Sequence, residues 1–298
     1  MNDETDFRSG FISIVGRPNV GKSTLVNAVV GEKIAAVSDK PNTTRNRILG
    51  IRNLPDAQFV FLDTPGIHKA RGKLGKAMVQ TAMSAVREAD VILMMVEVKE
   101  PFGKGDTFII ESLPKPAILL VNKIDKIKKG ELLPILNQAR KFESKFLEII
   151  PISAATADGI PELLAAIRNR LPEGPKYFPD DMITDQPERF LAAELIREKI
   201  FNLTQQEIPY KTAVSIEEFK DIPEKKIVHI SAVIYVERMN HKGIIIGKGG
   251  EMLKEIGSRA RTDIERILGS KVFLELWVKV SENWTDRENL IRDFGYGS

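Results

Sequence analysis

Cysteine is absent from the 298-residue chain, and histidine occurs only three times. A chain without cysteine forms no disulfide and no thiolate-ligated metal site, so any metal must take oxygen or nitrogen ligands. This composition suits a reducing cytosol. His68, His229 and His241 have no carboxylate or nucleophile at a spacing that would pair with them, so none is predicted to be catalytic.

Long apolar runs are also missing. The longest, residues 91–98 and 117–121, have the length of strands, whereas a membrane-spanning helix needs about 20 apolar residues. Residues 1–9 are short, polar and acidic, which predicts a flexible tail without a secretory signal. We therefore expect a cytoplasmic protein. The net charge of +3 neither requires nor excludes an anionic partner.

The chain is too long for one domain of ordinary size, and its pattern changes near residue 171. Residues 10–171 alternate short apolar runs with longer mixed segments, which predicts an α/β domain with a mixed, mostly parallel sheet. The second and third strands are joined too closely for a crossover, so we expect them to be antiparallel. The expected strands are 11–15, 47–53, 58–62, 91–96, 117–122 and 149–152, and the expected helices follow Gly21 and lie near 73–88, 106–112, 131–142 and 161–170.

Residues 172–187 are rich in proline and have no period, which predicts a linker. Residues 188–298 then change to the order helix, strand, strand, helix, helix, strand, with a C-terminal tail. This order predicts a smaller α+β domain. Its expected elements are a helix at 188–206, strands at 212–218 and 226–237, a helical stretch with a glycine-rich turn at 241–268, and a strand at 272–280.

A phosphate-binding loop is the clearest motif. Residues 16–23 read Gly-Arg-Pro-Asn-Val-Gly-Lys-Ser directly after a predicted strand and at the start of a predicted helix. In this pattern the backbone N–H groups bind phosphate oxygens, Lys22 reaches the β- and γ-phosphates, and Ser23 offers a hydroxyl to Mg²⁺. A glycine-rich turn that binds nothing is a weak alternative, because strand, loop and helix are all in place.

A second motif, Asp63-Thr64-Pro65-Gly66, follows another apolar strand. Its carboxylate stands at the carboxyl end of the strand, where ligands bind in such sheets. Asp63 can hold Mg²⁺, and the N–H of Gly66 can sense a γ-phosphate. Alone this motif is more often a plain turn, but after the loop at 16–23 it indicates a nucleotide site.

The base is selected by Asn122-Lys123-Ile124-Asp125. The Asp125 carboxylate can accept hydrogen bonds from N1–H and the exocyclic amine of guanine, a pair that adenine cannot offer. Asn122 would tie loops together, Lys123 would cover the ring, and the Ser153-Ala154-Ala155 segment would present a backbone N–H to guanine O6. The set predicts GTP rather than ATP as the substrate.

A glycine-rich turn marks the second domain. Residues 244–256 contain an apolar run, then Gly-x-x-Gly, then an amphipathic helix, an arrangement that is typical of KH domains. A lone Gly-x-x-Gly is weak evidence, but the domain order fits the type II KH fold and basic residues surround the turn. The expected RNA-binding residues are Ile244, Ile245, Ile246, Gly247, Lys248, Gly249, Gly250, Lys242, Lys254 and Arg259.

These motifs together resemble the Era-like family of bacterial GTPases, which joins a Ras-like P-loop domain to a type II KH domain. The likeness covers essentially the whole chain. It implies a catalytic set of Lys22, Thr44, Asp63 and Gly66 and metal ligands Ser23, Thr44 and Asp63. The residues expected at GTP or GDP are Gly16, Arg17, Pro18, Asn19, Val20, Gly21, Lys22, Ser23, Thr24, Thr43, Thr44, Asp63, Thr64, Pro65, Gly66, Ile67, Asn122, Lys123, Asp125, Ser153 and Ala154.

One position departs from the Ras-like pattern. Ile67 stands where those enzymes carry a glutamine that orients water, so hydrolysis must be organised differently. In the resembling branch, an asparagine at the position of Asn19 helps to hold K⁺. A loop amide that makes only local hydrogen bonds is an equally good interpretation of Asn19.

The resemblance implies binding near the 3′ end of small-subunit ribosomal RNA, on the 30S subunit or its precursor, by a monomer that can associate peripherally with the inner membrane. Composition by itself indicates neither the binding to ribosomal RNA nor the membrane association. An RNA-binding assembly factor with a mainly structural nucleotide stays open as an alternative because of Ile67. A tRNA-modifying GTPase is disfavoured since no second catalytic site is visible.

Overall fold

The computed structural model describes residues 7–70 and 72–296. Most of the expected N-terminal tail, residues 1–6, and the last two residues of the C-terminal tail lie outside the described residues. The described end of the N-terminal tail differs from the prediction, because strand β1 already begins at Arg8. The contacts divide the chain into two units. The first unit is Met1–Ala35, Thr44–Ala70 and Met78–Asp185, and the second unit is Ala36–Thr43, Arg71–Ala77 and Gln186–Ser298.

The first unit is built on a six-stranded sheet in the order β2-β3-β1-β4-β5-β6. Only β2 is antiparallel to its neighbour, as the short connection predicted. The carboxyl ends of β1, β3, β4 and β5 therefore meet at one edge. The strands are β1 (Arg8–Gly16), β2 (Ile48–Leu54), β3 (Ala57–Asp63), β4 (Val91–Glu97), β5 (Ala117–Asn122) and β6 (Phe146–Pro151).

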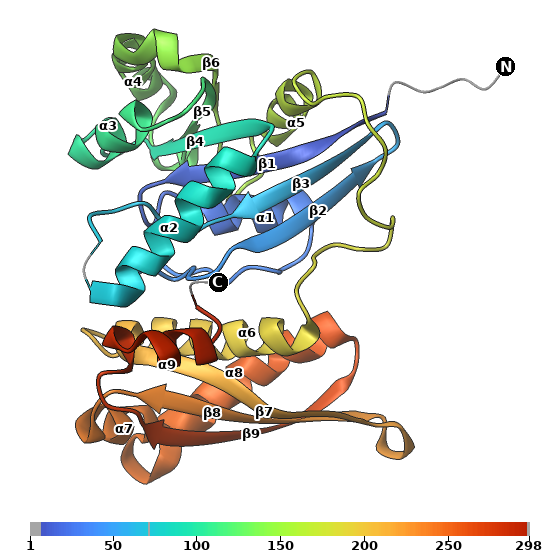
Figure 1. Cartoon of the computed structure of the whole chain (residues 1–298), viewed down its shortest axis with the longest axis vertical. Coiled ribbons are helices and arrows are strands. Elements are labelled where there is room, and N and C mark those ends of the chain that lie inside the picture. The colour runs from blue at the N-terminus through green and yellow to red at the C-terminus, as the bar shows by residue number, and fades with distance from the viewer. Residues whose placement is uncertain (1–6, 71, 297–298) are drawn as a thin grey trace, which may run out of the picture. The chain divides into compact units, whose positions relative to one another are not determined.

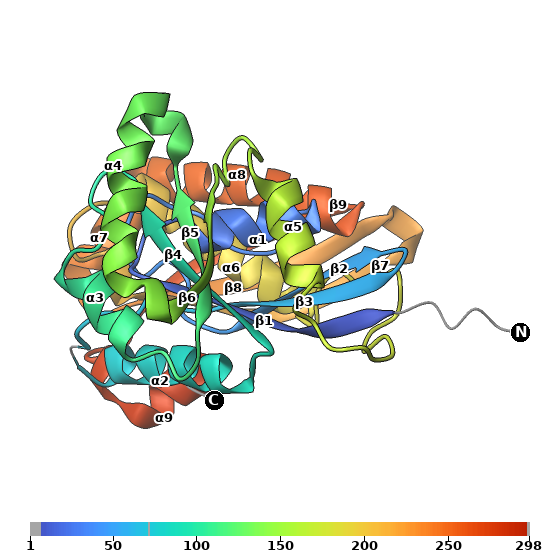
Figure 2. The same ribbon diagram turned by 90° about the horizontal axis from the view of Figure 1, so that it is seen from above.

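Helices cover both faces of this sheet (Figures 1 and 2). Helices α2 and α3 pack on one face, and α1 and α5 lie on the other. Gly50 of β2 lies under α1, where a Cβ atom would be 2.9 Å from Val26 Cγ1. The helices are α1 (Lys22–Val30), α2 (Gly72–Glu88), α3 (Lys104–Glu111), α4 (Lys129–Ala139) and α5 (Ile160–Arg168).

Part of the expected linker belongs to the first unit, which extends to Asp185. The buried side chain of Gln58 accepts hydrogen bonds from the backbone N–H groups of Tyr177 (2.7 Å) and Phe178 (2.9 Å), and donates one to Phe178 O (2.8 Å). The backbone of Ile51 donates to Ile183 O at 2.9 Å. The proline-rich segment is thus extended chain that packs on β2 and β3.

The second unit is a three-stranded sheet in the order β7-β8-β9, with α6 and α8 on one face (Figure 1). Strands β7 and β8 are antiparallel, and β8 and β9 are parallel. The order of elements is the type II KH order that the sequence predicted. They are α6 (Glu188–Leu203), β7 (Thr212–Ile222), β8 (Ile227–Val236), α7 (Met239–Ile246), α8 (Glu251–Leu268) and β9 (Lys271–Val280).

One further helix, α9 (Glu288–Asp293), was not predicted. It is held by aromatic contacts: the ring of Phe294 lies 4.8 Å from that of Tyr235 and 5.2 Å from that of Trp284, centroid to centroid. A six-residue helix has too little periodicity to be visible in the sequence. Over the part of the chain that the structure describes, no helix combines the length and apolarity that crossing a bilayer requires.

Candidate nucleotide site and RNA-binding turn

The loop at 16–23 joins the end of β1 to the start of α1, where N–H groups at the helix N-terminus are free to bind phosphate. Gly21 has φ +106°, and a Cβ atom there would lie 2.2 Å from Asn122 Nδ2. Asn122 ends β5, donates from Nδ2 to Val20 O at 2.7 Å and accepts from the N–H of Ala154 at 3.0 Å. The buried side-chain amide of Asn122 thus connects three loops of the site. Gly21 has no side chain and so leaves room for this amide.

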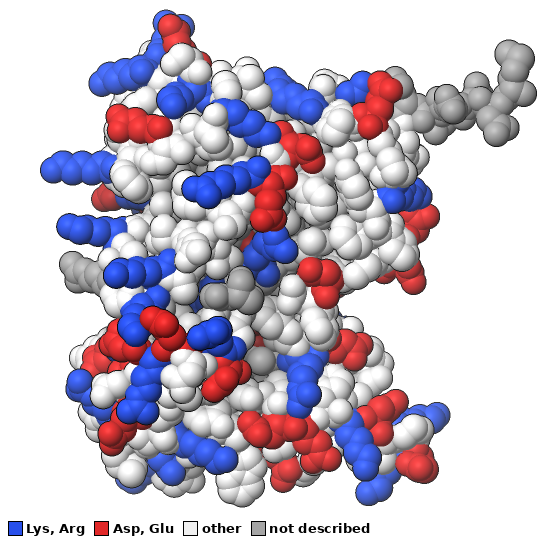
Figure 3. All heavy atoms as spheres, in the orientation of Figure 1, with Lys and Arg blue, Asp and Glu red and all other residues white. Residues whose placement is uncertain are grey.

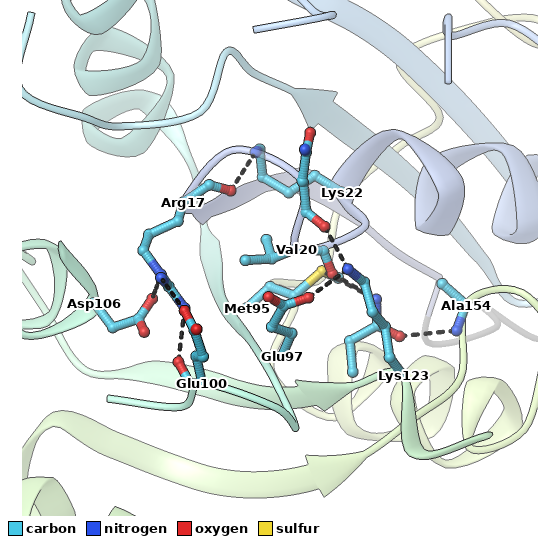
Figure 4. A network of polar contacts seen from close by, with 11 residues as sticks. Arg17, Val20, Lys22, Met95, Glu97, Glu100, Asp106, Lys123 and Ala154 are labelled. Atoms are coloured by element: carbon cyan, nitrogen blue, oxygen red, sulfur yellow. Dashed lines mark hydrogen bonds and ion pairs between the residues drawn. The ribbon is translucent and has the colours of Figure 1, made fainter. Parts of the chain in front are cut away.

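Lys22 points back over this loop and donates to Arg17 O at 3.2 Å (Figure 4). Its side chain is buried, which lowers the pKa of Lys22 to about 8, while the nearby charge of Asp63 opposes the shift. Without a phosphate nearby, the free-energy cost of burying the charged ammonium group is only partly compensated. Lys22 is therefore prepared for an anionic ligand.

Three oxygen-bearing side chains meet beside Lys22. Ser23 Oγ and Thr44 Oγ1 lie 2.8 Å apart, and Asp63 Oδ2 accepts hydrogen bonds from Ser23 Oγ (2.7 Å) and Thr44 Oγ1 (3.4 Å). Asp63 is fully buried, and its Oδ1 has no hydrogen-bond partner among the described residues. Burial raises the pKa of Asp63 against the opposing effects of Lys22 and the two hydroxyls. A cation would compensate this carboxylate, and two hydroxyls and a carboxylate are a ligand set that suits Mg²⁺.

The neighbouring Thr43 does not join this group. Its hydroxyl donates to Lys40 O at 2.9 Å, so it closes a turn of its own segment. Thr44, not Thr43, therefore lies with Ser23 and Asp63. Thr64 is also turned inward, since its hydroxyl donates to Ile14 O at 2.9 Å.

Gly66 lies against the phosphate loop, where a Cβ atom would be 2.6 Å from Pro18 N. The N–H of Ile67 donates to Gly16 O at 3.2 Å, and the Ile67 side chain is buried in the core with Val15. Ile67 therefore cannot orient water, because its side chain has no hydrogen-bonding group and points into the core.

The base-recognition residues lie on adjacent loops. Asp125 Oδ1 accepts a hydrogen bond from Ser153 Oγ at 2.7 Å, which orients an exposed carboxylate. Lys123 donates to Asn19 O at 2.7 Å and pairs with Glu97 (Figure 4). Within the segment expected to present an N–H to guanine, the N–H of Ala154 donates instead to Asn122 Oδ1 at 3.0 Å.

Ala155 and Arg17 complete this picture. Ala155 follows Ala154 and is exposed, so its N–H is the better candidate donor to guanine O6. The Arg17 side chain, expected at the nucleotide, instead donates to Asp106 Oδ1 of α3 (2.9 Å) and to Glu100 O (2.7 Å), as Figure 4 shows. Arg17 contributes its backbone to the loop and its side chain to anchoring α3.

The glycine-rich turn connects α7 to α8. Gly247 has φ +75°, and a Cβ atom there would lie 2.7 Å from Met252 Cβ, so this position requires glycine. Gly249 (φ +60°) and Gly250 (φ +85°) have open space beside them. Lys248 is exposed at the tip. A phosphate backbone can therefore approach the turn closely.

The apolar run before the turn divides between two roles. Ile244 is 48% exposed and is available to a ligand, whereas Ile245 is fully buried in the core of the second unit. The prediction that Ile245 lines the groove is therefore wrong, because helical periodicity turns it toward the sheet. Ile246 also packs partly on that core. Arg259 is paired with Glu255 at 2.6 Å, while Lys242 and Lys254 flank the turn.

Charge on the visible face of the protein is mixed. Figure 3 shows lysine and arginine interspersed with aspartate and glutamate, without one continuous basic field on that face.

Comparison with known proteins identifies both domains. Residues 11–123 match the family described as 50S ribosome-binding GTPase, and residues 207–285 match the KH domain family. The chain is 53% identical to GTPase Era of Geobacter metallireducens over 98% of this chain and 99% of that one, and 54% identical to GTPase Era of Syntrophus aciditrophicus over 97% and 95%.

The chain belongs to the Era family of GTPases. A crystal structure of Era in complex with MgGDPNP and nucleotides 1506–1542 of 16S ribosomal RNA has a TM-score of 0.95 and 46% identity, and covers 98% of this chain and 100% of that one. An Aquifex aeolicus Era variant bound to GDP and AlF₄⁻ is equally similar. The Ras-like first domain, the KH second domain and GTPase activity that the sequence predicted are confirmed.

The low pKa of Lys22 predicts a pH dependence of GTP binding in this Era-family GTPase. At about pH 7 and below, the amine is almost fully charged and GTP binds at full strength. Above pH 8 the neutral amine must take up a proton when phosphate binds, so affinity should fall by up to about tenfold per pH unit between roughly pH 8 and pH 9. Fluorescent GTP titrations at pH 7 to 9 measure this. Lys22→Met should bind weakly at every pH, and an equal fall in that variant would assign the effect to another group.

Proposed function

We propose that the protein is a GTP-hydrolysing switch that binds small-subunit ribosomal RNA near its 3′ end through the KH turn and acts on the 30S subunit or its precursor during assembly. The main support is a full-length relative, 46% identical, whose structure contains a GTP analogue and that RNA segment. The Gly247–Gly250 turn and the Ser23–Thr44–Asp63 group agree with this. Crosslinking the protein to cellular RNA and reading the bound sites tests it, and sites elsewhere than on small-subunit rRNA would contradict it.

Ser23, Thr44 and Asp63 would hold Mg²⁺, since their oxygens already converge and Asp63 Oδ1 lacks a partner. When bound, Mg²⁺ neutralises charge that develops on the β- and γ-phosphate oxygens. Lys22 adds a second positive charge at the same phosphates. The backbone of the loop at 16–23 fixes their position, and Gly66 admits the γ-phosphate without a side chain in its way.

Hydrolysis in this protein must proceed without two usual contributions. Ile67 is buried and apolar, and the Arg17 side chain is held by Asp106, so neither a water-orienting amide nor an arginine at the phosphates comes from these positions. We propose that K⁺ held with the help of Asn19 supplies the missing charge. Asn19 lies in the middle of the loop at 16–23 with φ +66°, and its carbonyl oxygen accepts a hydrogen bond from Lys123.

Intrinsic hydrolysis should accordingly be slow, about 10⁻⁴ to 10⁻² s⁻¹, the range of related enzymes without an activator. Replacing K⁺ by Na⁺ should lower it further, and Asn19→Ala should remove the difference between the two ions. Single-turnover phosphate release in the two salts measures both effects. Identical rates in K⁺ and Na⁺ would exclude potassium from the mechanism.

The competing function is an RNA-binding assembly factor in which the nucleotide is mainly structural, and the buried Ile67 is the observation in its favour. Multiple-turnover hydrolysis in the presence of small-subunit RNA separates the two. Turnover that RNA changes supports the switch, whereas one slow turnover unaffected by RNA supports a structural nucleotide. Peripheral membrane association and a monomeric state stay predictions of the family resemblance.

A further inference from the structure

Residues Ala36–Thr43 contact helix α6, although the chain continues into the nucleotide site at Thr44. The N–H of Val37 donates to Glu198 Oε2 at 2.9 Å, and the Lys40 ammonium donates to the carbonyls of Phe201 and Thr204 at the C-terminal end of α6. A cation at this end also interacts favourably with the helix dipole. The segment is thus held on α6 along its length.

The last of these contacts comes from Arg197. This arginine is fully buried on α6, and its Nη2 donates both to Glu194 Oε2 and to the carbonyl oxygen of Thr43. Its Nε donates to Glu194 Oε1 at 2.7 Å, and its guanidinium lies 5.2 Å from the ring centroid of Phe201. A buried guanidinium is costly unless its protons are satisfied. Glu194 balances the charge, the Thr43 carbonyl accepts a further hydrogen bond from Nη2, and Nη1 has no hydrogen-bond partner among the described residues.

The Thr43 carbonyl belongs to the same planar peptide unit as the N–H of Thr44. A donor fixed on the oxygen therefore limits rotation of the whole unit and orients Thr44. The hydroxyl of Thr44 lies 2.8 Å from Ser23 Oγ in the group of oxygens beside Lys22. One peptide plane thus joins a buried arginine of the KH-bearing unit to the threonine of the nucleotide site.

We propose that Arg197 is a positioning residue for GTP hydrolysis: it holds the Thr43 carbonyl and so places Thr44 for its role at Mg²⁺ and the γ-phosphate. The inference rests on the proposed role of Thr44. Its consequence is that the RNA-binding unit supplies a residue on which the GTPase reaction depends. GDP, which has no γ-phosphate for Thr44 to approach, should be bound independently of Arg197.

The test is single-turnover GTP hydrolysis, with Mg²⁺ titrated, in the full-length Arg197→Met variant. We expect a rate about tenfold lower, as for the loss of one positioning hydrogen bond, a higher Mg²⁺ requirement, and GDP affinity within about twofold of the parent. Arg189→Met is the matched control. Arg189 also lies on α6, but its hydrogen bonds to backbone carbonyls are directed to Ile216 (2.7 Å) and Glu217 (2.9 Å) and not to residues 36–43.

A double-mutant cycle distinguishes positioning from a general structural effect. If Arg197 acts through Thr44, Arg197→Met should slow the parent but leave Thr44→Ala no slower than before. Additive losses, or an equal loss in Arg189→Met, would overturn the proposal. A Thr44→Ala variant with parental Mg²⁺-dependent hydrolysis would instead contradict the role of Thr44 itself. Should Arg197→Met not fold, Lys40→Met, which loosens the same segment, takes its place in the cycle.

Discussion

Replacing Asp125 with asparagine is expected to lower GTP affinity roughly 10²- to 10³-fold, because one hydrogen bond to a charged group, which contributes about 1.5–3 kcal/mol, is lost and the other loses its charge. The asparagine oxygen can accept from guanine N1–H, but its amine then faces the exocyclic amine of guanine. Xanthine presents an oxygen at that position. The variant should therefore prefer xanthosine triphosphate, which competition titrations with the two nucleotides measure.

Asp158→Asn is the matched control for this substitution. Asp158 lies on the same loop system, where its backbone oxygen accepts a hydrogen bond from the N–H of Ser153 at 2.9 Å, and the residue is exposed. The substitution removes the same charge from the neighbourhood without removing a base contact. Parental GTP affinity in Asp125→Asn would contradict the assignment of this residue, and an equal loss in both variants would point to a general charge effect.

The parts of the site that the sequence predicted are those set by the backbone at strand ends. The loop at 16–23, the carboxylate of Asp63 and the amide of Asn122 each follow an apolar strand of a parallel sheet. In such a sheet, strand ends converge whatever the packing elsewhere. Sequence order alone is therefore enough to predict that they meet.

Side-chain direction within these motifs could not be predicted in the same way. Arg17 and Ala154 are members of the motifs, but Arg17 turns to a buried carboxylate of α3, and the Ala154 N–H is taken by Asn122. Ile245 belongs to an apolar run that suggested an RNA-binding groove, but the periodicity of the helix places its side chain in the core of the second unit. These outcomes depend on neighbours distant in sequence.

The contact between Arg197 and Thr43 spans 154 residues, and nothing near either residue indicates it. Helix α6 is unusual in burying charged side chains, among them Glu194, Arg197 and Glu198. Charged side chains of a helix usually lie on its solvated face, and nothing in the sequence indicated that these would be buried. Only the placement of residues 36–43 on that face shows why it is charged and buried.

A double substitution at the glycine-rich turn, Lys248→Glu with Gly249→Asp, is expected to weaken RNA binding at least about 100-fold, because like charges brought together cost several kcal/mol. Gly249 has open space beside it, and φ +60° is a conformation that aspartate tolerates, so the turn should keep its shape. Gly247→Asp should also abolish binding, but by distorting the turn against Met252. Filter binding with an RNA of the 16S 3′-end sequence measures the effect.

The control applies the same two kinds of substitution at the far end of α8, as Lys271→Glu with Gly269→Asp. Gly269 has φ +61° and open space beside it, like Gly249, and the 18-residue helix places the two ends about 27 Å apart. The variants share their change in charge, and the control also removes an exposed ion pair of Lys271 with Glu265 at 3.6 Å. We expect only the turn variant to lose RNA binding. GTP affinity should be unchanged in both variants, since the phosphate loop belongs to the first unit. Equal losses in the two would mean that RNA responds to the net charge of the unit, and the turn would not be its binding site.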